Sequence, residues 1–148
     1  MKPDAQDVLA YLTELTLTQV APKVQPPYLA GTLGMIGTAL AVLTEEWDRA
    51  AHRLVEENRA IRALFRKAES LSLDAGLAGE LRALAGGEDD DLHIRALDAG
   101  NAALRAALIR LQTAVETRDD AAAKALNEAI WAELAASTVR RKQASAPF

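Results

Sequence analysis

Two asparagine–arginine pairs have the residue types and spacing closest to those of a ligand-binding site. Asn58 and Arg62 are one helical turn apart, as are Asn101 and Arg105, and both pairs lie in the pattern L-x-x-x-N-x-x-[IL]-R-A. An asparagine on an apolar helix face usually fixes the register of packed helices. The two pairs could instead line a polar pocket that binds an anionic ligand through the arginines. We predict that Asn58 and Asn101 meet between two antiparallel helices, and the ligand site is our second hypothesis.

A second group, Asp48, His52 and Glu56, contains side chains of the types that bind metal ions. Their spacing of four residues places them on one face of a helix. The sequence lacks the Glu-x-x-His pairs of a ferritin-like di-metal site. His52 lies nearly opposite Ala50 around the helix, so we interpret this face as solvated and predict neither a metal nor a cofactor.

An acidic run, Glu88 to Asp91, precedes a predicted helix and lies close to His93. The run could bind a divalent cation, but it lacks the spacing and the glycine of a calcium-binding loop. Carboxylates at the start of a helix are favoured by its positive end, so we expect helix capping here. A proton-transfer role for His93 is conceivable, and an exposed histidine in the capping region is the simpler interpretation.

Composition and missing motifs disfavour several classes of function. The 148 residues carry a net charge of −4 with acids and bases interspersed, which does not match a nucleic-acid-binding surface. The sequence contains no cysteine, which excludes disulfides and thiolate chemistry. It also shows no phosphate-binding loop, nucleophile elbow or nucleotide fingerprint, so no motif supports an enzymatic activity and we favour a non-catalytic role. Because the sequence shows no signal-peptide pattern at its start, we expect a cytoplasmic protein.

The element that must position these residues is a long helix at about residues 28–71. Apolar residues recur there in steps of three and four, and no proline interrupts the stretch. Residues 28–43 carry no charge, so we expect this half to form the central core. A membrane span is the competing interpretation. Sixteen apolar residues cover only ~24 Å where a bilayer core needs about 30 Å, so we favour a buried helix over a membrane span.

Three further helices are predicted near residues 4–18, 92–117 and 120–142. Between the long helix and the third one, residues 72–91 form a hinge region with a short helix, in which Asp74 is the expected N-cap and two glycines the stop. We expect a disordered tail at residues 143–148. The sequence thus predicts a single all-α domain, 1–148, an antiparallel bundle with coiled-coil-like packing. In it the first and last helices surround the apolar half of the long helix.

The length of the predicted central helix also favours self-association. At roughly 65 Å it is too long for four helices of unequal length to cover easily. We therefore predict a homodimer, with close packing near three glycines between residues 31 and 37. The first function hypothesis is a non-catalytic interaction or scaffold protein. The alternative is a small-molecule binder or accessory enzyme that uses the pocket around Asn58 and Asn101.

Overall fold

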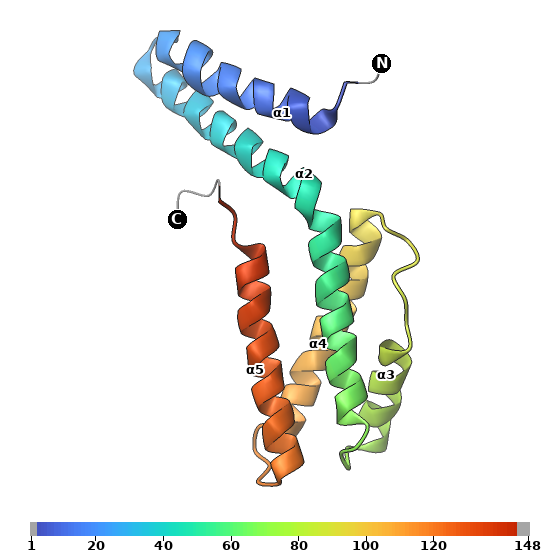
Figure 1. The fold of residues 1–148 in the computed structure, drawn as a ribbon. Coiled ribbons are helices and arrows are strands. Elements are labelled where there is room, and N and C mark those ends of the chain that lie inside the picture. Colours follow the sequence, from blue (N-terminus) through green and yellow to red (C-terminus); the bar gives the residue numbers. More distant parts are fainter. Residues whose placement is uncertain (1–2, 145–148) are drawn as a thin grey trace. The chain divides into compact units, whose positions relative to one another are not determined.

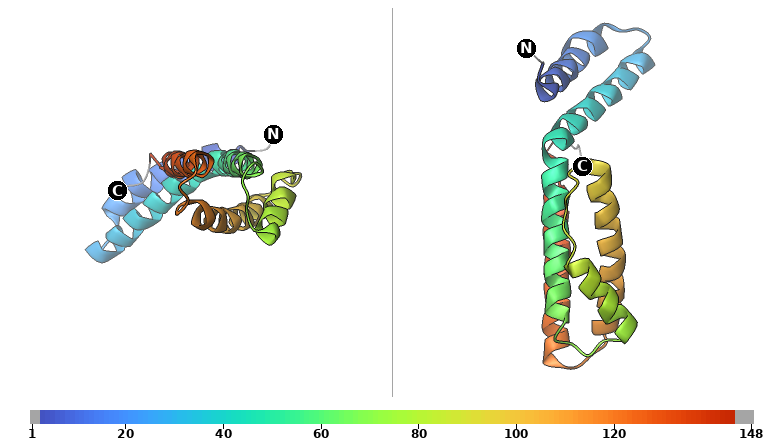
Figure 2. Two further views of the ribbon diagram at one scale, coloured as in Figure 1. Left: turned by 90° about the horizontal axis from the view of Figure 1, so that it is seen from below. Right: turned by 90° about the vertical axis from the view of Figure 1, so that its right-hand side faces the viewer.

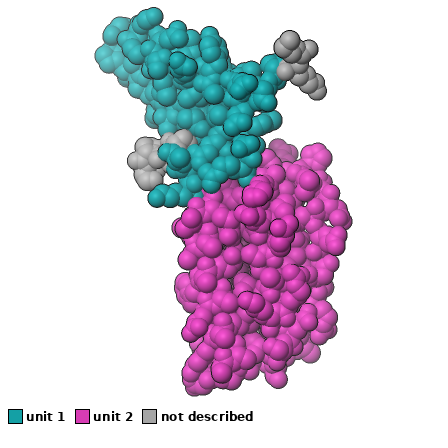
Figure 3. Space-filling model, viewed as in Figure 1, with its two compact units in different colours: residues 1–50, 142–148 teal, residues 51–141 magenta. Residues whose placement is uncertain are grey.

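The structure is a computed structural model that describes residues 3–144. Every regular element in this range is helical, which confirms the predicted all-α bundle built on a long helix. The chain divides into two compact units, which Figure 3 shows in separate colours. Unit 1 comprises residues 1–50 and 142–148, and unit 2 comprises residues 51–141.

Unit 1 contains the first helix, α1 (Ala5–Glu14), and the first half of α2 (Pro27–Ala68). Asp4 caps α1, because its carboxylate accepts hydrogen bonds from the second and third backbone N–H groups of the helix. The helix continues as a π-helical segment, Leu15–Val20, and ends in a 3-10 turn, Ala21–Lys23. It therefore runs slightly beyond the predicted residue 18. Figure 1 shows α1 running back beside the first half of α2.

Unit 2 contains the second half of α2 with α3 (Ala75–Ala85), α4 (Ile94–Val115) and α5 (Ala121–Arg141). As predicted, the Asp74 carboxylate caps α3 by accepting from two backbone N–H groups. The four segments share one hydrophobic core. Its buried members are Ile61, Leu64, Phe65, Ala68, Leu81, Ala85, Leu104, Ala107, Leu108, Leu111, Val115, Ala123, Leu126 and Ile130.

The relative direction of α2 and α4 differs from the prediction. Within unit 2 the two helices run in the same direction, as Figures 1 and 2 show. Asn101 contacts Asn58 near the start of α4, and Arg118, just after α4, bonds to Ser72, just after α2. The two helices are parallel because α3 and the link at residues 86–93 carry the chain back to the level at which α4 begins. Helix α5 then returns antiparallel to α4.

The location of the core also corrects the prediction. Within the described chain, the hydrophobic core belongs to unit 2, and the uncharged half of α2 lies in unit 1 with several large apolar side chains exposed. The last helix, which was expected to surround that half, belongs to unit 2. Of the glycines between 31 and 37, Gly37 is buried against the Leu17 side chain, whereas Gly31 and Gly34 face open space.

Candidate functional site

A buried polar network crosses the interior of unit 2 between α2 and α4. Glu57, Asn58 and Asn101 are almost completely buried, with exposed fractions of 0%, 0% and 3%. The Asn101 amide nitrogen donates to the Asn58 side-chain oxygen at 3.0 Å and to a Glu57 carboxylate oxygen at 3.3 Å. The predicted meeting of the two asparagines is therefore confirmed, although the helices that carry them are parallel.

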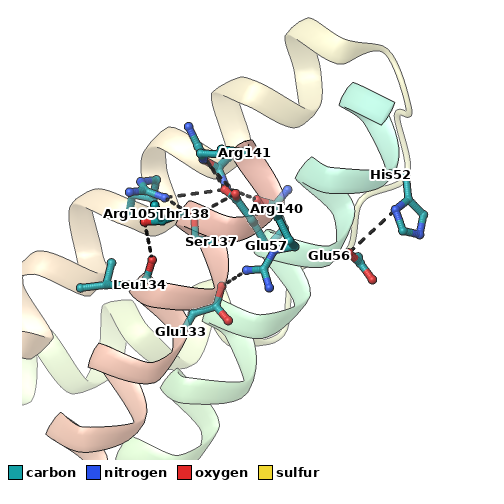
Figure 4. A network of polar contacts seen from close by, with 12 residues as sticks. His52, Glu56, Glu57, Arg105, Glu133, Leu134, Ser137, Thr138, Arg140 and Arg141 are labelled. Atoms are coloured by element: carbon teal, nitrogen blue, oxygen red, sulfur yellow. Dashed lines mark hydrogen bonds and ion pairs between the residues drawn. The ribbon is translucent and has the colours of Figure 1, made fainter. Parts of the chain in front are cut away.

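Glu57 is held by cationic and hydroxyl groups from α4 and α5, which Figure 4 shows converging on its carboxylate. Arg141 donates through Nε at 2.9 Å and through a terminal nitrogen at 2.6 Å, one bond to each oxygen. The Ser137 hydroxyl donates at 2.9 Å, and an Arg105 nitrogen lies 3.6 Å away. A buried carboxylate is costly unless it is paired and hydrogen-bonded, and both conditions are met here.

Asp89 forms the other end of the polar network, on the link between α3 and α4. Arg62 donates to both Asp89 oxygens, at 2.8 and 2.9 Å, in a bidentate pair. The Asn58 amide donates to the same carboxylate at 3.0 Å. The network therefore runs without interruption from Arg62 on α2, through Asp89 and the two asparagines, to Glu57 and its partners on α5.

The network lowers the pKa of both of its carboxyl groups, Glu57 and Asp89. Burial alone raises the pKa of Glu57, but hydrogen bonds from Arg141 and Ser137 and the charges of Arg141 and Arg105 outweigh it, so this pKa lies below its ordinary value. The Arg62 hydrogen bonds hold the pKa of Asp89 below its ordinary value, while burial opposes them. Both groups are therefore stabilised as carboxylates.

The four residues proposed from sequence as a ligand site all belong to this network. Arg62 bonds to Asp89, and Arg105 lies beside Glu57 and donates to Ser137 at 3.4 Å. In this arrangement the internal carboxylates occupy the positions at which the arginines would bind an anionic ligand. Apart from the buried Nε of Arg62, these polar groups bond to one another, as expected of a network that fixes how helices pack.

Sequence reasoning missed four members of the network, Glu57, Asp89, Ser137 and Arg141. Glu57 interrupts the apolar stripe of α2, and a carboxylate at a core position is itself a signal of a buried ion pair. Arg141 lies in the last turn of α5, where a basic side chain is common, and Asp89 belongs to the acidic run for which capping was expected. Their partners are far away in sequence, as Glu57 and Arg141 show, which are 84 positions apart.

The expected capping role of the acidic run is wrong for α4. The N-cap of that helix is His93, which makes no side-chain capping bond, and its first turn contains no acid. Asp91 instead accepts from the His93 backbone N–H at 2.9 Å and contacts its ring, and both side chains are exposed. His93 is thus an exposed residue at a helix start, as the simpler interpretation had it.

The three residues considered as metal ligands, Asp48, His52 and Glu56, are exposed. His52 and Glu56 form a loose pair with 3.8 Å between Nδ1 and the carboxylate. Among residues 3–144, no group of three His, Cys, Asp or Glu side chains is arranged to hold a metal ion.

A pocket of about 710 Å³ lies beside the Asp89 end of the network. One wall is formed by Arg59, Arg62 and Arg66 on a single face of α2, and the other by the end of α3 and residues 86–90. Arg66 donates to the Ala85 carbonyl at 3.0 Å, and Arg59 is exposed. The pocket has the volume of a small-molecule site, and its charge is mixed, since Glu88 and Asp90 also line it.

Unit 1 presents a different feature, which we name the apolar surface. It consists of exposed large apolar side chains on α1, the turns that follow it and the first half of α2. They are Val8, Tyr11, Leu12, Leu17, Val20, Tyr28, Leu29, Met35, Ile36, Leu43 and Trp47. By length and composition alone, α2 would also qualify as a membrane-spanning helix, and only 6% of its most apolar window is buried.

Comparison with known proteins gives no further assignment, because no family model, curated protein or solved structure matches this chain. The class that the fold defines is an all-α helical bundle protein.

Proposed function

We propose that this chain is a non-catalytic interaction or scaffold protein that acts as a homodimer through the apolar surface of unit 1. The observation that supports the proposal is the uneven burial of apolar residues. Unit 2 has a closed core, whereas unit 1 leaves Tyr28, Met35 and Trp47 exposed by 72%, 68% and 62%. A concentration of exposed large apolar side chains is typical of interaction sites.

The apolar surface is large enough for a stable protein interface. A fully exposed aromatic side chain offers about 150–250 Å², so Tyr11, Tyr28 and Trp47 together contribute roughly 300–500 Å². The aliphatic side chains of the same surface bring the total towards the ~800 Å² per partner of a standard interface. At about 25 cal/mol per Å² of buried apolar area, association would be strongly favourable before its entropic costs.

The charges of unit 1 favour a protein partner over a lipid surface. Between residues 3 and 44, the acids are Asp4, Asp7 and Glu14, and the only base is Lys23. Helices that lie on membranes carry lysines and arginines on their polar face, which attract anionic lipids. The net negative charge of this segment instead opposes binding to such a surface.

Light scattering of the full chain at micromolar concentration tests the proposal. We expect a mass twice the 15.8 kDa of one chain. Ile36→Lys places a charge on the apolar surface and should weaken the dimer at least tenfold. Ile109→Lys is the matched control, because Ile109 is 66% exposed but lies on α4 in unit 2.

Two results would reject the homodimer. One is a monomer of the native chain at these concentrations. The other is co-flotation of the chain with vesicles of phosphatidylcholine and phosphatidylglycerol that Ile36→Lys abolishes, because the apolar surface would then serve a membrane.

A second candidate function, binding of a small anionic ligand, is suggested by the exposed Arg59 that lines the pocket beside Asp89. Isothermal titration with inorganic phosphate and with citrate tests it. Binding that Arg59→Gln weakens, and that Arg95→Gln on an exposed position of α4 leaves unchanged, would support this function. Absence of binding of either anion at millimolar concentration would reject it.

A further inference from the structure

The exposed half of α2 carries a regular stripe within the apolar surface. Leu29, Thr32, Ile36, Ala39 and Leu43 are all exposed, and they follow one another in steps of three, four, three and four residues. This is the spacing of the contact positions in a coiled coil. We propose that a second copy of this chain packs along this stripe with its own α2 antiparallel to the first, an inference that rests on the proposed function.

The surroundings of the stripe favour a second copy as its occupant. No charged residue occurs between Val24 and Thr44, so two copies can approach without repulsion between like charges. In heterotypic coiled coils, charged residues beside the stripe select one partner and exclude others. Here those flanking positions carry no charge, and the contact relies on apolar packing that is the same in both copies.

Charge at the two ends of the stripe determines the orientation. Its C-terminal end is followed by Glu45, Glu46 and Asp48, of which Glu45 pairs with Arg49. A parallel dimer would place the two acidic clusters side by side. In an antiparallel dimer each cluster lies at the N-terminal end of the partner's α2, which has no acid in its first turn and is preceded by Lys23. That end carries the positive pole of the helix, so the antiparallel arrangement pairs opposite charges.

The three largest side chains of the stripe suggest a register. Ile36 is its midpoint, with Leu29 seven residues before it and Leu43 seven residues after it. A two-fold axis at Ile36 therefore brings Ile36 against its own copy, and Leu29 against Leu43 of the second copy. Such an arrangement is self-complementary and closes as a dimer.

Cysteine cross-linking tests the orientation directly, because the chain contains no native cysteine. Contact positions of two packed helices approach closely enough for a disulfide, which requires Cα atoms about 4.4–6.8 Å apart. We expect Ile36→Cys to cross-link efficiently under mild oxidation. The double variant Leu29→Cys/Leu43→Cys should cross-link as well, whereas Leu29→Cys and Leu43→Cys alone should remain uncrosslinked. Met35→Cys, beside the stripe, is the control for random collision.

The outcomes separate this inference from the proposed function. Self-cross-linking of Leu29→Cys and of Leu43→Cys would show a parallel dimer and overturn the antiparallel arrangement alone. A dimer by light scattering in which no stripe variant cross-links above the Met35→Cys control would overturn the stripe as the contact. A monomer by light scattering would overturn the proposed function and this inference with it. Each variant is compared with the native chain by circular dichroism, so that loss of cross-linking is read only from folded protein.

Discussion

Asn101 is the residue through which the two ends of the buried polar network are joined. Its amide nitrogen serves the Asn58 oxygen and the Glu57 carboxylate, and its oxygen lies 3.5 Å from an Arg141 nitrogen. These contacts also determine the orientation of the amide, because the carboxylate requires an N–H donor. An alanine could supply none of them, and an aspartate would bring a second negative charge beside Glu57.

We therefore predict that Asn101→Ala lowers the free energy of unfolding by about 1–3 kcal/mol, because it leaves buried polar partners unsatisfied. Asn101→Asp should cost more at pH 7, since its carboxylate adds charge repulsion to the same loss. Urea denaturation followed by circular dichroism measures both. Equal stability of the two variants would contradict the added charge repulsion, and changes within about 0.5 kcal/mol of the native chain would show that Asn101 behaves as a surface residue.

The lowered pKa values of Glu57 and Asp89 predict loss of stability in acid. The ordinary pKa is 4.5 for Glu57 and 3.8 for Asp89, and both pKa values are lower in the folded chain. The stability that such a carboxyl group adds to the fold is complete above its pKa in the unfolded chain. It is lost as the pH falls through the folded pKa. Burial raises the pKa of Glu133, which acts in the opposite sense and favours folding as the pH falls.

We expect the free energy of unfolding to change little between pH 7 and about pH 5 and to fall below about pH 4.5. Glu57→Gln should flatten this acid limb, because it removes a carboxyl group whose pKa is lowered in the folded chain. Urea titrations at several pH values test the prediction. An acid limb unchanged in Glu57→Gln would mean that other carboxylates cause it.

At the scale of single elements, Gly37 joins the two segments of unit 1. A Cβ atom at this position would overlap the Cγ and Cδ2 atoms of Leu17 on the π-helical segment. At Gly31 a Cβ atom would meet no atom within 4 Å. The two glycines lie in the same helix but differ in the room available to a side chain.

Replacement of each glycine by alanine should therefore have opposite effects. Gly31→Ala should stabilise the chain by roughly 0.5–1 kcal/mol, the usual gain in an exposed helix interior. Gly37→Ala should lose this gain and destabilise the chain by about 1–3 kcal/mol, because Leu17 must move. Thermal unfolding monitored by circular dichroism compares them. A similar gain for both variants would show that α1 and its continuation do not pack against α2 at Gly37.

For the whole molecule, a homodimer makes the measured stability depend on concentration. Association of folded chains stabilises them by mass action, so the Tm of the native chain should rise by several degrees between 1 and 100 µM. Ile36→Lys should remove this dependence, whereas Ile109→Lys should retain it. A Tm of the native chain that is constant across this range would contradict the dimer independently of light scattering.

The sequence alone determined those features that arise from neighbouring residues. Pro27 begins the long helix, Asp74 caps α3, and the spacing of apolar residues defines α4 and α5. These features could be predicted because caps, prolines and periodicity act within a few residues. The repeated asparagine pattern also identified the contact between Asn58 and Asn101. These predictions needed no knowledge of how the elements pack.

Only the tertiary structure decided the direction of α4, the partners of Glu57 and the location of the core. The first depends on the path of the link at residues 86–93, and the second on Arg141, which is 84 residues away in sequence. The uncharged half of α2 shows most clearly why the location of the core could not be predicted. Its sequence is apolar enough for a core, but unit 1 provides too few helices to cover it. Hydrophobicity favours burial of such a segment but does not specify the surface that buries it, since the hydrophobic effect is non-directional.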